Sequence, residues 1–431
     1  MLDIQFIREN HQIVRDTVVN KNKSVDIDRL LEVDEKRRQL MQEVEKLRKA
    51  RNETSAQMKN GVPAPELIAE GKRIKESISE IESELDPTDI EFEELMLKVP
   101  NIPLEEVPIG KSEDENVIIG KSGEPTKFTF DPKNHWEIAQ QHDWIDKERA
   151  AKVAGSRFAY LKGGLVQLQF GIVQYVINRL TDEDFLKDVI KQAGLTISSK
   201  PFVPVIPPMI VNTVAYKASA RLDAEKVTYK LADDEMWLNA SAEHSLCNMY
   251  MNEVLEENDL PIRYIGYATS FRREAGTYGK DTEGIFRTHQ FDKLEMESFT
   301  TPATGLEEHH LMVAIQKRFM DELKIPYQVL EKCTADIGFP NAKGVDIEAW
   351  LPGQDKYIET HSADYMADFQ ARRLKTRVKI GHETHFVHTN DATALVLSRI
   401  PVAIIENFQT KDGDVVIPKV LRPFMGEREK I

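Results

Sequence analysis

Two series of residues near the N-terminus, spaced alternately three and four positions apart, constrain the fold of this chain more than any other feature. Such spacing places one face of a helix against a partner helix. The segment Gly61-Val62-Pro63-Ala64-Pro65 interrupts the pattern, because proline and glycine end helices. The two series therefore predict an antiparallel two-helix coiled coil over about residues 28–99, in which Pro87 kinks or restarts the second helix. The members are Leu30, Val33, Arg37, Leu40, Val44, Leu47, Arg51, Thr54 and Met58, then Leu67, Gly71, Ile74, Ile78, Ile81, Leu85, Thr88, Phe92, Leu95 and Val99.

The far half of this hairpin is basic, although the chain as a whole is acidic. Residues 36–75 hold eleven basic and five acidic residues, a net charge of +6, whereas the 431-residue chain carries −15. A charge of −15 excludes a uniformly basic nucleic-acid binder, so any RNA contact must be a local patch. At about 1.5 Å per residue, helices of about 30 residues reach roughly 45 Å. The alternative is an ordinary solvated face. The candidate RNA contacts are Arg37, Arg38, Lys46, Arg48, Lys49 and Arg51.

A proline-rich stretch indicates where the domain boundary lies. A proline-rich stretch at 99–108 predicts an N-terminal domain over 1–100, a linker over 101–110 and a larger domain over 111–431. The start MLDIQFIREN lacks a basic-then-apolar signal and no apolar run is long enough to span a bilayer, which predicts a cytoplasmic protein without membrane attachment. Two cysteines, Cys247 and Cys333, argue against a disulfide framework.

The stretch Phe271–Phe299 carries the chemistry. A β-forming run over 264–271 ends at Arg272 and Arg273, a loop with three glycines follows over 275–284, and a second strand is predicted over 285–297. Arginine forks match phosphate oxygens, and an aromatic ring such as Phe291 stacks on a flat base. The pattern predicts a hairpin that binds a polyanion. The alternative is a surface hairpin whose charges are solvated.

The order FRREAGTYGKDTEGIFRTHQFDKLE resembles motif 2 of class II aminoacyl-tRNA synthetases, in the version typical of seryl-tRNA synthetases. The resemblance implies an α+β fold, in which an antiparallel sheet with flanking helices is joined to an N-terminal coiled-coil arm that grips tRNA. It also implies an enzyme that activates L-serine with ATP and Mg²⁺ and charges tRNA(Ser) as a homodimer. A second substrate, tRNA(Sec), stays open.

The same resemblance implies roles for the residues of this stretch. Arg272 matches the arginine that holds the α-phosphate and the amino-acid carboxylate, and with Arg399 it forms the expected catalytic pair. Glu295 matches a carboxylate of the serine pocket. The other expected ATP contacts are Arg273, Glu274, Arg287 and Phe291.

Two further segments supply the rest of the site. Trp237–Glu243 resembles the strand that recognises serine, and implies serine contacts from Ser241, Ala242 and Glu243, with Ser241 in place of the usual threonine. Val345–Arg373 resembles the family segment that binds metal and phosphate. It implies Mg²⁺ ligands at Glu359 and Ser362, and ATP contacts from Glu359, Thr360, His361 and Ser362. His361 alternatively fills space beneath the site.

Motifs 1 and 3 have counterparts as well. A helix over 165–180 and a strand over 202–211 resemble motif 1, the dimer interface of these enzymes, although a helix packed on its own sheet fits equally. Residues 393–409 resemble motif 3, in which Arg399 clamps the γ-phosphate and Thr393 contacts serine. Because Pro401 removes a helix donor, the local backbone is expected to rearrange.

Four alternatives remain open. His382, His385 and His388 recur every third residue and form a possible zinc triad. The departures at Ser241, Thr360–His361 and Asp391–Ser398 also fit a paralogue that binds RNA or a partner without charging tRNA. They fit equally an enzyme that activates threonine or alanine. A plain coiled-coil scaffold would make the chain beyond residue 110 dispensable.

Overall fold

The computed structural model describes residues 1–58, 64–220, 227–274 and 284–431. The chain divides into two compact units, Met1–Pro100 and Asn101–Ile431. Within the described ranges, no helix combines the length and apolar character that crossing a bilayer requires.

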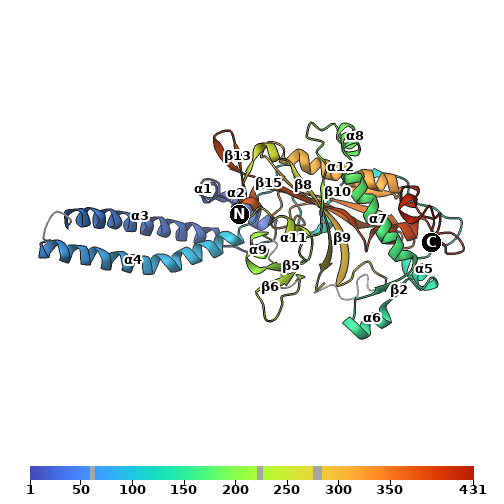
Figure 1. Ribbon diagram of the computed structural model, residues 1–431, viewed down its shortest axis with the longest axis horizontal. Helices are drawn as coiled ribbons and strands as arrows, with labels where there is room; N and C mark the ends of the chain where they lie inside the picture. Colours follow the sequence, from blue (N-terminus) through green and yellow to red (C-terminus); the bar gives the residue numbers. More distant parts are fainter. Residues whose placement is uncertain (59–63, 221–226, 275–283) are drawn as a thin grey trace. The chain divides into compact units, whose positions relative to one another are not determined.

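The first unit is helical. Two short helices, α1 (Ile4–Glu9) and α2 (His11–Asn20), precede α3 (Ile27–Met58) and α4 (Pro65–Lys98). Figure 1 shows α3 and α4 lying side by side, as the heptad pattern predicts. Every heptad position except Arg51 is buried or half-buried. The predicted breaker at Gly61–Pro63 lies outside the described residues.

The helix α4 continues through Pro87, so the helix does not restart there, and a kink, the other expected outcome, stays a prediction. A proline inside a helix costs about 3 kcal/mol, and contacts with α3 on both sides of Pro87 offset that cost. Lys36 pairs with Glu84 at 2.7 Å, and Arg37 pairs with Asp89. Thr88, the next residue, is buried in the seam. Packing against the partner helix therefore outweighs the local preference.

The second unit is built on an eight-stranded sheet. All neighbouring strands are antiparallel except β4 and β8, which confirms the predicted antiparallel sheet. The strands, in spatial order, are β1 (Val117–Ser122), β10 (Tyr327–Glu331), β11 (Lys343–Leu351), β12 (Lys356–Ala367), β15 (His388–Val396), β9 (Gln290–Thr300), β8 (Ile262–Phe271) and β4 (Val203–Val205).

Helices cover one face of this sheet (Figure 1). The core lies between that face and α7 (Gly164–Leu180), α8 (Glu183–Ala193) and α12 (Gly305–Leu323). Because strand side chains alternate between faces, Leu294 and Met296 of β9 enter this core, while Glu295 lies on the opposite face. That opposite face is polar, and it carries the site.

Shorter elements surround the sheet. The helices are α5 (His135–Gln141), α6 (Lys147–Ala154), α9 (Thr213–Ala218), α11 (Glu243–Leu246), α13 (Phe369–Leu374) and α14 (Ile400–Asn407), with 3₁₀ turns at Glu113–Glu115, Glu257–Asp259 and Lys419–Met425. The strands are β2 (Ile145–Asp146), β3 (Tyr160–Leu161), β5 (Ile210–Asn212), β6 (Met236–Leu238), β7 (Val254–Glu256), β13 (Arg377–Ile380) and β14 (Glu383–Phe386).

Three local expectations need correction. The second hairpin strand begins at Gln290 rather than Ile285, because Ile285 and Phe286 pack into the core instead of pairing with β8. The strand predicted over 202–211 is two short strands, β4 and β5, separated by a segment with two prolines. Pro401 lies in the first turn of α14, where a backbone donor has no intrahelical acceptor, so it costs the helix no hydrogen bond.

Candidate active site

Residues distant in the sequence meet on the polar face of the sheet. Arg399, which precedes α14, donates from Nη1 to Oε1 of Glu359 on β12 at 2.8 Å and to the Glu359 carbonyl at 2.9 Å. Its guanidinium carbon lies 5.1 Å from the ring centre of Phe286. These contacts join α14, β12 and the segment that precedes β9.

Arg272, at the end of β8, belongs to the same cluster. Its Nε donates to the Ala240 carbonyl at 3.2 Å, and its guanidinium carbon lies 5.3 Å from the ring centre of Phe291. Burial lowers the pKa of the Arg272 guanidinium, and the charge of Arg399 lowers it further, against opposing contributions from Glu274, Glu359 and Glu295. Two cations held this close favour an anion between them.

The other charges of the motif 2 segment divide into two groups. Arg287 donates to Glu274 at 3.1 Å, so the two limbs of the hairpin are joined by this ion pair. Arg273 is exposed, and its guanidinium carbon lies 5.9 Å from the ring centre of Tyr229. Most of the predicted glycine-rich loop, residues 275–283, lies outside the described residues.

A β-bulge on β12 decides which of the residues 359–362 face the site. The register with β11 shifts between Ile347 and Glu348, so Glu359 pairs with Glu348 and Ser362 with Asp346, both on the polar face. His361 pairs with the core residue Ile347 and is 1% exposed. Burial lowers the pKa of His361 to about 3 and keeps the ring neutral.

The side chains of Thr360 and His361 are therefore buried in the sheet, although the charges of Glu359 and Arg399 still act on the His361 ring. Thr360 Oγ1 lies 2.8 Å from His361 Nδ1 and donates to the Ile347 carbonyl at 3.2 Å. The two side chains therefore contact each other inside the sheet.

Behind Glu359 lies a buried lysine that sequence reasoning missed. Lys332 donates to Ser362 Oγ at 2.8 Å and pairs with Asp364 at 3.0 Å and Asp346 at 3.3 Å. A Cβ at Gly344 would lie 2.3 Å from Lys332 Cε, so the glycine makes room for the lysine. A lysine just after a strand is normally solvated, and the only sequence signal was the glycine within β11.

Nearby charges and burial shift the pKa values of the Glu359 and Asp346 carboxyl groups. Desolvation acts to raise the pKa of Glu359, but Arg399 and Lys332 outweigh it and hold the pKa below its usual range. Burial raises the pKa of Asp346 to about 7, although Lys332 acts against the shift. Glu359 is therefore ionised at neutral pH, whereas the pKa of the neighbouring Asp346 carboxyl is about 7.

A second cluster, of buried polar side chains, lies on β9 and β15. Glu295 and Thr393 are directly opposed cross-strand partners, and both are buried. Glu295 pairs with Lys293; burial raises the pKa of Glu295, with Lys293 and Arg272 acting against the shift and Glu243 with it. The Glu243 carboxylate is thus close enough to interact with Glu295.

The segment that supplies Glu243 approaches β8 because Gly266 lacks a side chain. A Cβ there would lie 2.7 Å from Leu246 Cδ1 and 3.2 Å from the Ala242 Cβ. Ser241 Oγ accepts from the Glu243 backbone at 3.3 Å, and Gln370 donates to Glu243 Oε1 at 3.2 Å. The three predicted serine contacts, Ser241, Ala242 and Glu243, therefore reach the same face as Glu295.

A cavity of about 190 Å³ lies next to Phe291. Its lining includes Ile285, Thr288, Phe291, Leu397 and Ser398, but none of Arg272, Arg399 and Glu359. Its mixture of apolar and hydroxyl groups suits a flat heterocycle.

The three histidines do not form a metal cluster. His385 pairs with Glu383 at 3.3 Å, and His388 Nδ1 lies 2.7 Å from the Tyr365 hydroxyl, while His382 lies in the turn between β13 and β14. In the parts of the chain that the structure describes, no group of three or more His, Cys, Asp or Glu side chains could hold a metal ion.

The basic residues of the arm divide into two classes. Arg37, Arg38 and Arg48 form ion pairs with Asp89, Glu35 and Glu82 respectively. Lys46, Lys49 and Arg51 form no ion pair with any described residue. The second class is available for another partner.

Comparisons with known proteins agree with this site. The family model of the class II tRNA synthetase core domain (G, H, P, S and T) matches residues 226–408, and the model of the seryl-tRNA synthetase N-terminal domain matches residues 1–103. Together the sheet, the converging arginines and these matches define a class II aminoacyl-tRNA synthetase.

Sequence relatives and solved structures show which family within this class the chain belongs to. Serine–tRNA ligases of Symbiobacterium thermophilum and Thermodesulfovibrio yellowstonii are 38% and 37% identical, over 98% and 99% of both chains. The crystal structure of seryl-tRNA synthetase from Pyrococcus horikoshii complexed with ATP matches with a TM-score of 0.88 and 35% identity, over 100% of this chain and 99% of that one. The cytoplasmic serine–tRNA ligase of Naegleria fowleri in complex with AMP matches with a TM-score of 0.85 and 28% identity, over 100% and 98%. The chain belongs to the seryl-tRNA synthetase family.

Proposed function

We propose that this chain activates L-serine with ATP to seryl-adenylate and then transfers serine to the 3′ end of tRNA(Ser). It is a ligase that forms aminoacyl-tRNA. The observation that carries the proposal is the convergence of Arg272, Arg399 and Glu359 beside the pocket of Glu295 and Thr393.

The arginines take the triphosphate. Arg272 holds the α-phosphate and the serine carboxylate, and Arg399 and Arg287 hold the distal phosphates, with Glu274 orienting Arg287. Adenine occupies the cavity and stacks on Phe291. The side chains of Arg273, Thr360 and His361 are not part of this set, because the first is exposed and lies over Tyr229 and the other two are buried in the sheet.

The residues around Ser362 fit Mg²⁺. Ser362 Oγ accepts from Lys332 and donates to Asp346, which leaves a lone pair on the hydroxyl oxygen. Glu359, held anionic by Arg399, supplies a hard oxygen ligand. Mg²⁺ bound by Glu359 and Ser362 would neutralise charge on the phosphate oxygens.

The first step needs little proton transfer. A carboxylate oxygen of serine attacks the α-phosphorus of ATP, a P–O bond forms, and the bond to pyrophosphate breaks. The protein supplies positioning and neutralisation of the developing charge, mainly from Arg272. In the second step a hydroxyl of the terminal ribose of tRNA attacks the seryl carbonyl carbon, an ester forms, and AMP leaves.

The acidic pocket selects the amino acid. Glu295 and Glu243 face the serine ammonium, which competes with Lys293 for the Glu295 carboxylate. The Thr393 and Ser241 hydroxyls lie on the same face, and a buried hydroxyl left unpaired would disfavour alanine.

The partners follow from surface chemistry. The N-terminal unit binds tRNA(Ser), and in the same way tRNA(Sec), through Lys46, Lys49 and Arg51. The ion-paired side chains of Arg37, Arg38 and Arg48 contribute less. Exposed apolar side chains of the second unit support a homodimer, which we place in the cytoplasm; they are Phe170, Val203, Ile206, Ile210 and Val214.

Amino-acid-dependent exchange of pyrophosphate into ATP tests the proposal. Exchange with serine, and at least about a hundredfold less with threonine or alanine, is the expected result. No exchange by well-folded protein would replace the enzyme with the non-charging paralogue, and a preference for threonine or alanine would replace its substrate.

A further inference from the structure

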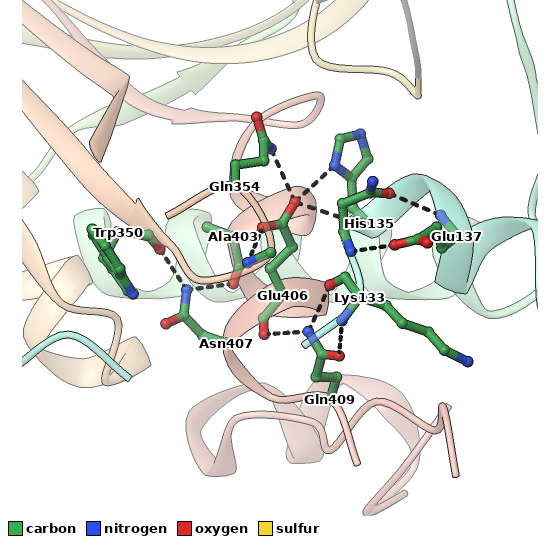
Figure 2. Close-up of polar contacts among 11 residues, drawn as sticks. Lys133, His135, Glu137, Trp350, Gln354, Ala403, Glu406, Asn407 and Gln409 are labelled. Carbon is green, nitrogen blue, oxygen red and sulfur yellow. Dashed lines mark hydrogen bonds and ion pairs between the residues drawn. The ribbon is translucent and has the colours of Figure 1, made fainter. Parts of the chain in front are cut away.

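A buried carboxylate at the other end of α14 holds a segment that lies far away in the sequence. Glu406 is completely buried, and its Oε1 accepts from the His135 backbone at 3.1 Å, from His135 Nδ1 at 2.9 Å and from Gln354 at 3.0 Å. Its Oε2 accepts from the Gly353 backbone at 3.0 Å. Figure 2 shows the carboxylate between the Gln354 side chain and the His135 ring. No residue of this cluster belongs to the expected serine or ATP site.

The neighbouring residues fix the position of His135 as well. The Gln409 side chain accepts from the Lys133 backbone and donates to its carbonyl, both at 2.8 Å (Figure 2). Asn134 caps α5 in a reciprocal pair of bonds with Glu137. A Cβ at Gly353 would lie 2.5 Å from the Lys133 carbonyl oxygen, so the chain is pressed against this glycine. The start of α5 is therefore seated rigidly on the end of α14.

The other side of the His135 ring meets the hairpin of the ATP site. Its Nε2 is buried without a hydrogen-bond partner among the described residues. A Cβ at Gly284 would lie 1.9 Å from that atom, so the ring edge lies directly against the Gly284 backbone, which has a positive φ of 64°. Only a glycine fits there, because of both the backbone conformation and the ring.

Gly284 leads at once into residues of the phosphate cluster. Phe286, two residues on, lies under the Arg399 guanidinium, and Arg287 pairs with Glu274. The return limb of the hairpin, residues 284–287, thus contacts motif 3 twice. Arg399 makes one contact at the start of α14, and Glu406 makes the other near its end through His135.

We propose that Glu406 and His135 are positioning residues that set the return limb 284–287 against Arg399 and so shape the ATP phosphate site. This inference rests on the proposed function, because that function assigns Arg287 and Arg399 to the ATP phosphates. It extends that function to two residues that touch neither substrate.

Three variants of the full-length protein test the proposal. His135→Asn keeps an amide nitrogen near the Nδ1 position, which bonds Glu406, but leaves the space beside Gly284 empty. Glu406→Gln removes the charge that holds the ring. Gln354→Ala is the matched control, because it removes another donor to Glu406 and leaves His135 in place.

The readouts separate positioning from folding. We expect His135→Asn and Glu406→Gln to raise KM for ATP, and the Kd for ATP measured by calorimetry without serine, by about tenfold. The KM for serine should stay within about twofold, and the control should match wild type in both.

Two results would overturn the inference. One is an unchanged ATP Kd in His135→Asn. The other is an equal rise of both KM values together with a lower Tm, which is the signature of a merely structural contact. Wild-type protein without serine-dependent exchange would instead defeat the proposed function, so the two failures are distinguishable.

Discussion

The Arg399 guanidinium lies 2.8 Å from the Glu359 carboxylate and bonds the Glu359 carbonyl as well, so one side chain joins α14 to β12 across the polar face of the sheet. Both bonds come from Nη1, and the planar guanidinium holds its other N–H groups in a fixed fork that suits phosphate oxygens, which lysine lacks. We expect Arg399→Lys to lower the serine-dependent exchange rate by about a hundredfold, because both the phosphate contact and the Glu359 contact lose geometry. Arg422→Lys, at a surface pair with Glu429, is the control. Equal activity of the two variants would remove Arg399 from the nucleotide site.

Removal of the Lys332 charge should expose its two roles. In Lys332→Met the carboxylates of Asp346 and Asp364 lose their counter-ion, and we expect the free energy of unfolding in urea to fall by about 3 kcal/mol. Because Ser362 also loses its donor, the Mg²⁺ concentration for half-maximal exchange should rise severalfold.

Lys343→Met provides the comparison for Lys332. Lys343 is similarly buried and paired with Glu331, but has no bond to Ser362. It should lose stability with no change in Mg²⁺ dependence. A shift of the Mg²⁺ requirement in both variants would show that general destabilisation is the cause.

The neutral, buried His361 predicts a pH dependence of stability. The unfolded chain binds a proton on this histidine near pH 6.5, whereas the folded chain does so only near pH 3, because burial lowers the pKa. The unfolded state therefore holds more protons between these values. The free energy of unfolding should fall as pH drops from 6.5 toward 3, by up to about 1.4 kcal/mol per pH unit from this residue.

Unfolding of His361→Gln over the same pH range checks this expectation. The variant should show a shallower fall than wild type, while His385→Gln, at an exposed position, should show the wild-type slope. Parallel curves for wild type and His361→Gln would mean that His361 is not held neutral.

The arm should bind tRNA mainly through the basic side chains that form no ion pair with a described residue. We expect the double change Lys49→Ala and Arg51→Ala to weaken tRNA binding about tenfold and to reduce the dependence of log K on log salt by about two phosphate contacts. Arg37→Ala should do less, because Arg37 is already paired with Asp89. Exchange without tRNA should be unchanged in both variants. A larger loss from Arg37→Ala than from the double change would reverse the assignment of the binding face.

Sequence reasoning succeeded where the signal was local and repeated. The heptad spacing predicted the α3–α4 pair, and the β-forming run over 264–271 predicted the strand that ends just before Arg272. It failed where distant contacts decide the outcome. Pro87 remains inside α4 because α3 packs beside it, Ile285 leaves the strand to enter the core, and a one-residue bulge turns His361 away from Glu359.

Lys332 and Glu406 show the same limit at the site itself. Neither carries a pattern that marks it as buried, since a lysine after a strand and a glutamate on a helix are solvated in most proteins. Their partners come from other strands or from residues more than 200 positions away, such as His135. Only the tertiary structure brings these partners within bonding distance.

A crystal structure of this chain with a non-hydrolysable seryl-adenylate analogue tests the central claim most directly. We expect the phosphate between Arg272 and Arg399, adenine against Phe291, and the serine ammonium at Glu295. An analogue bound elsewhere, or these side chains turned away from it, would contradict the proposed site.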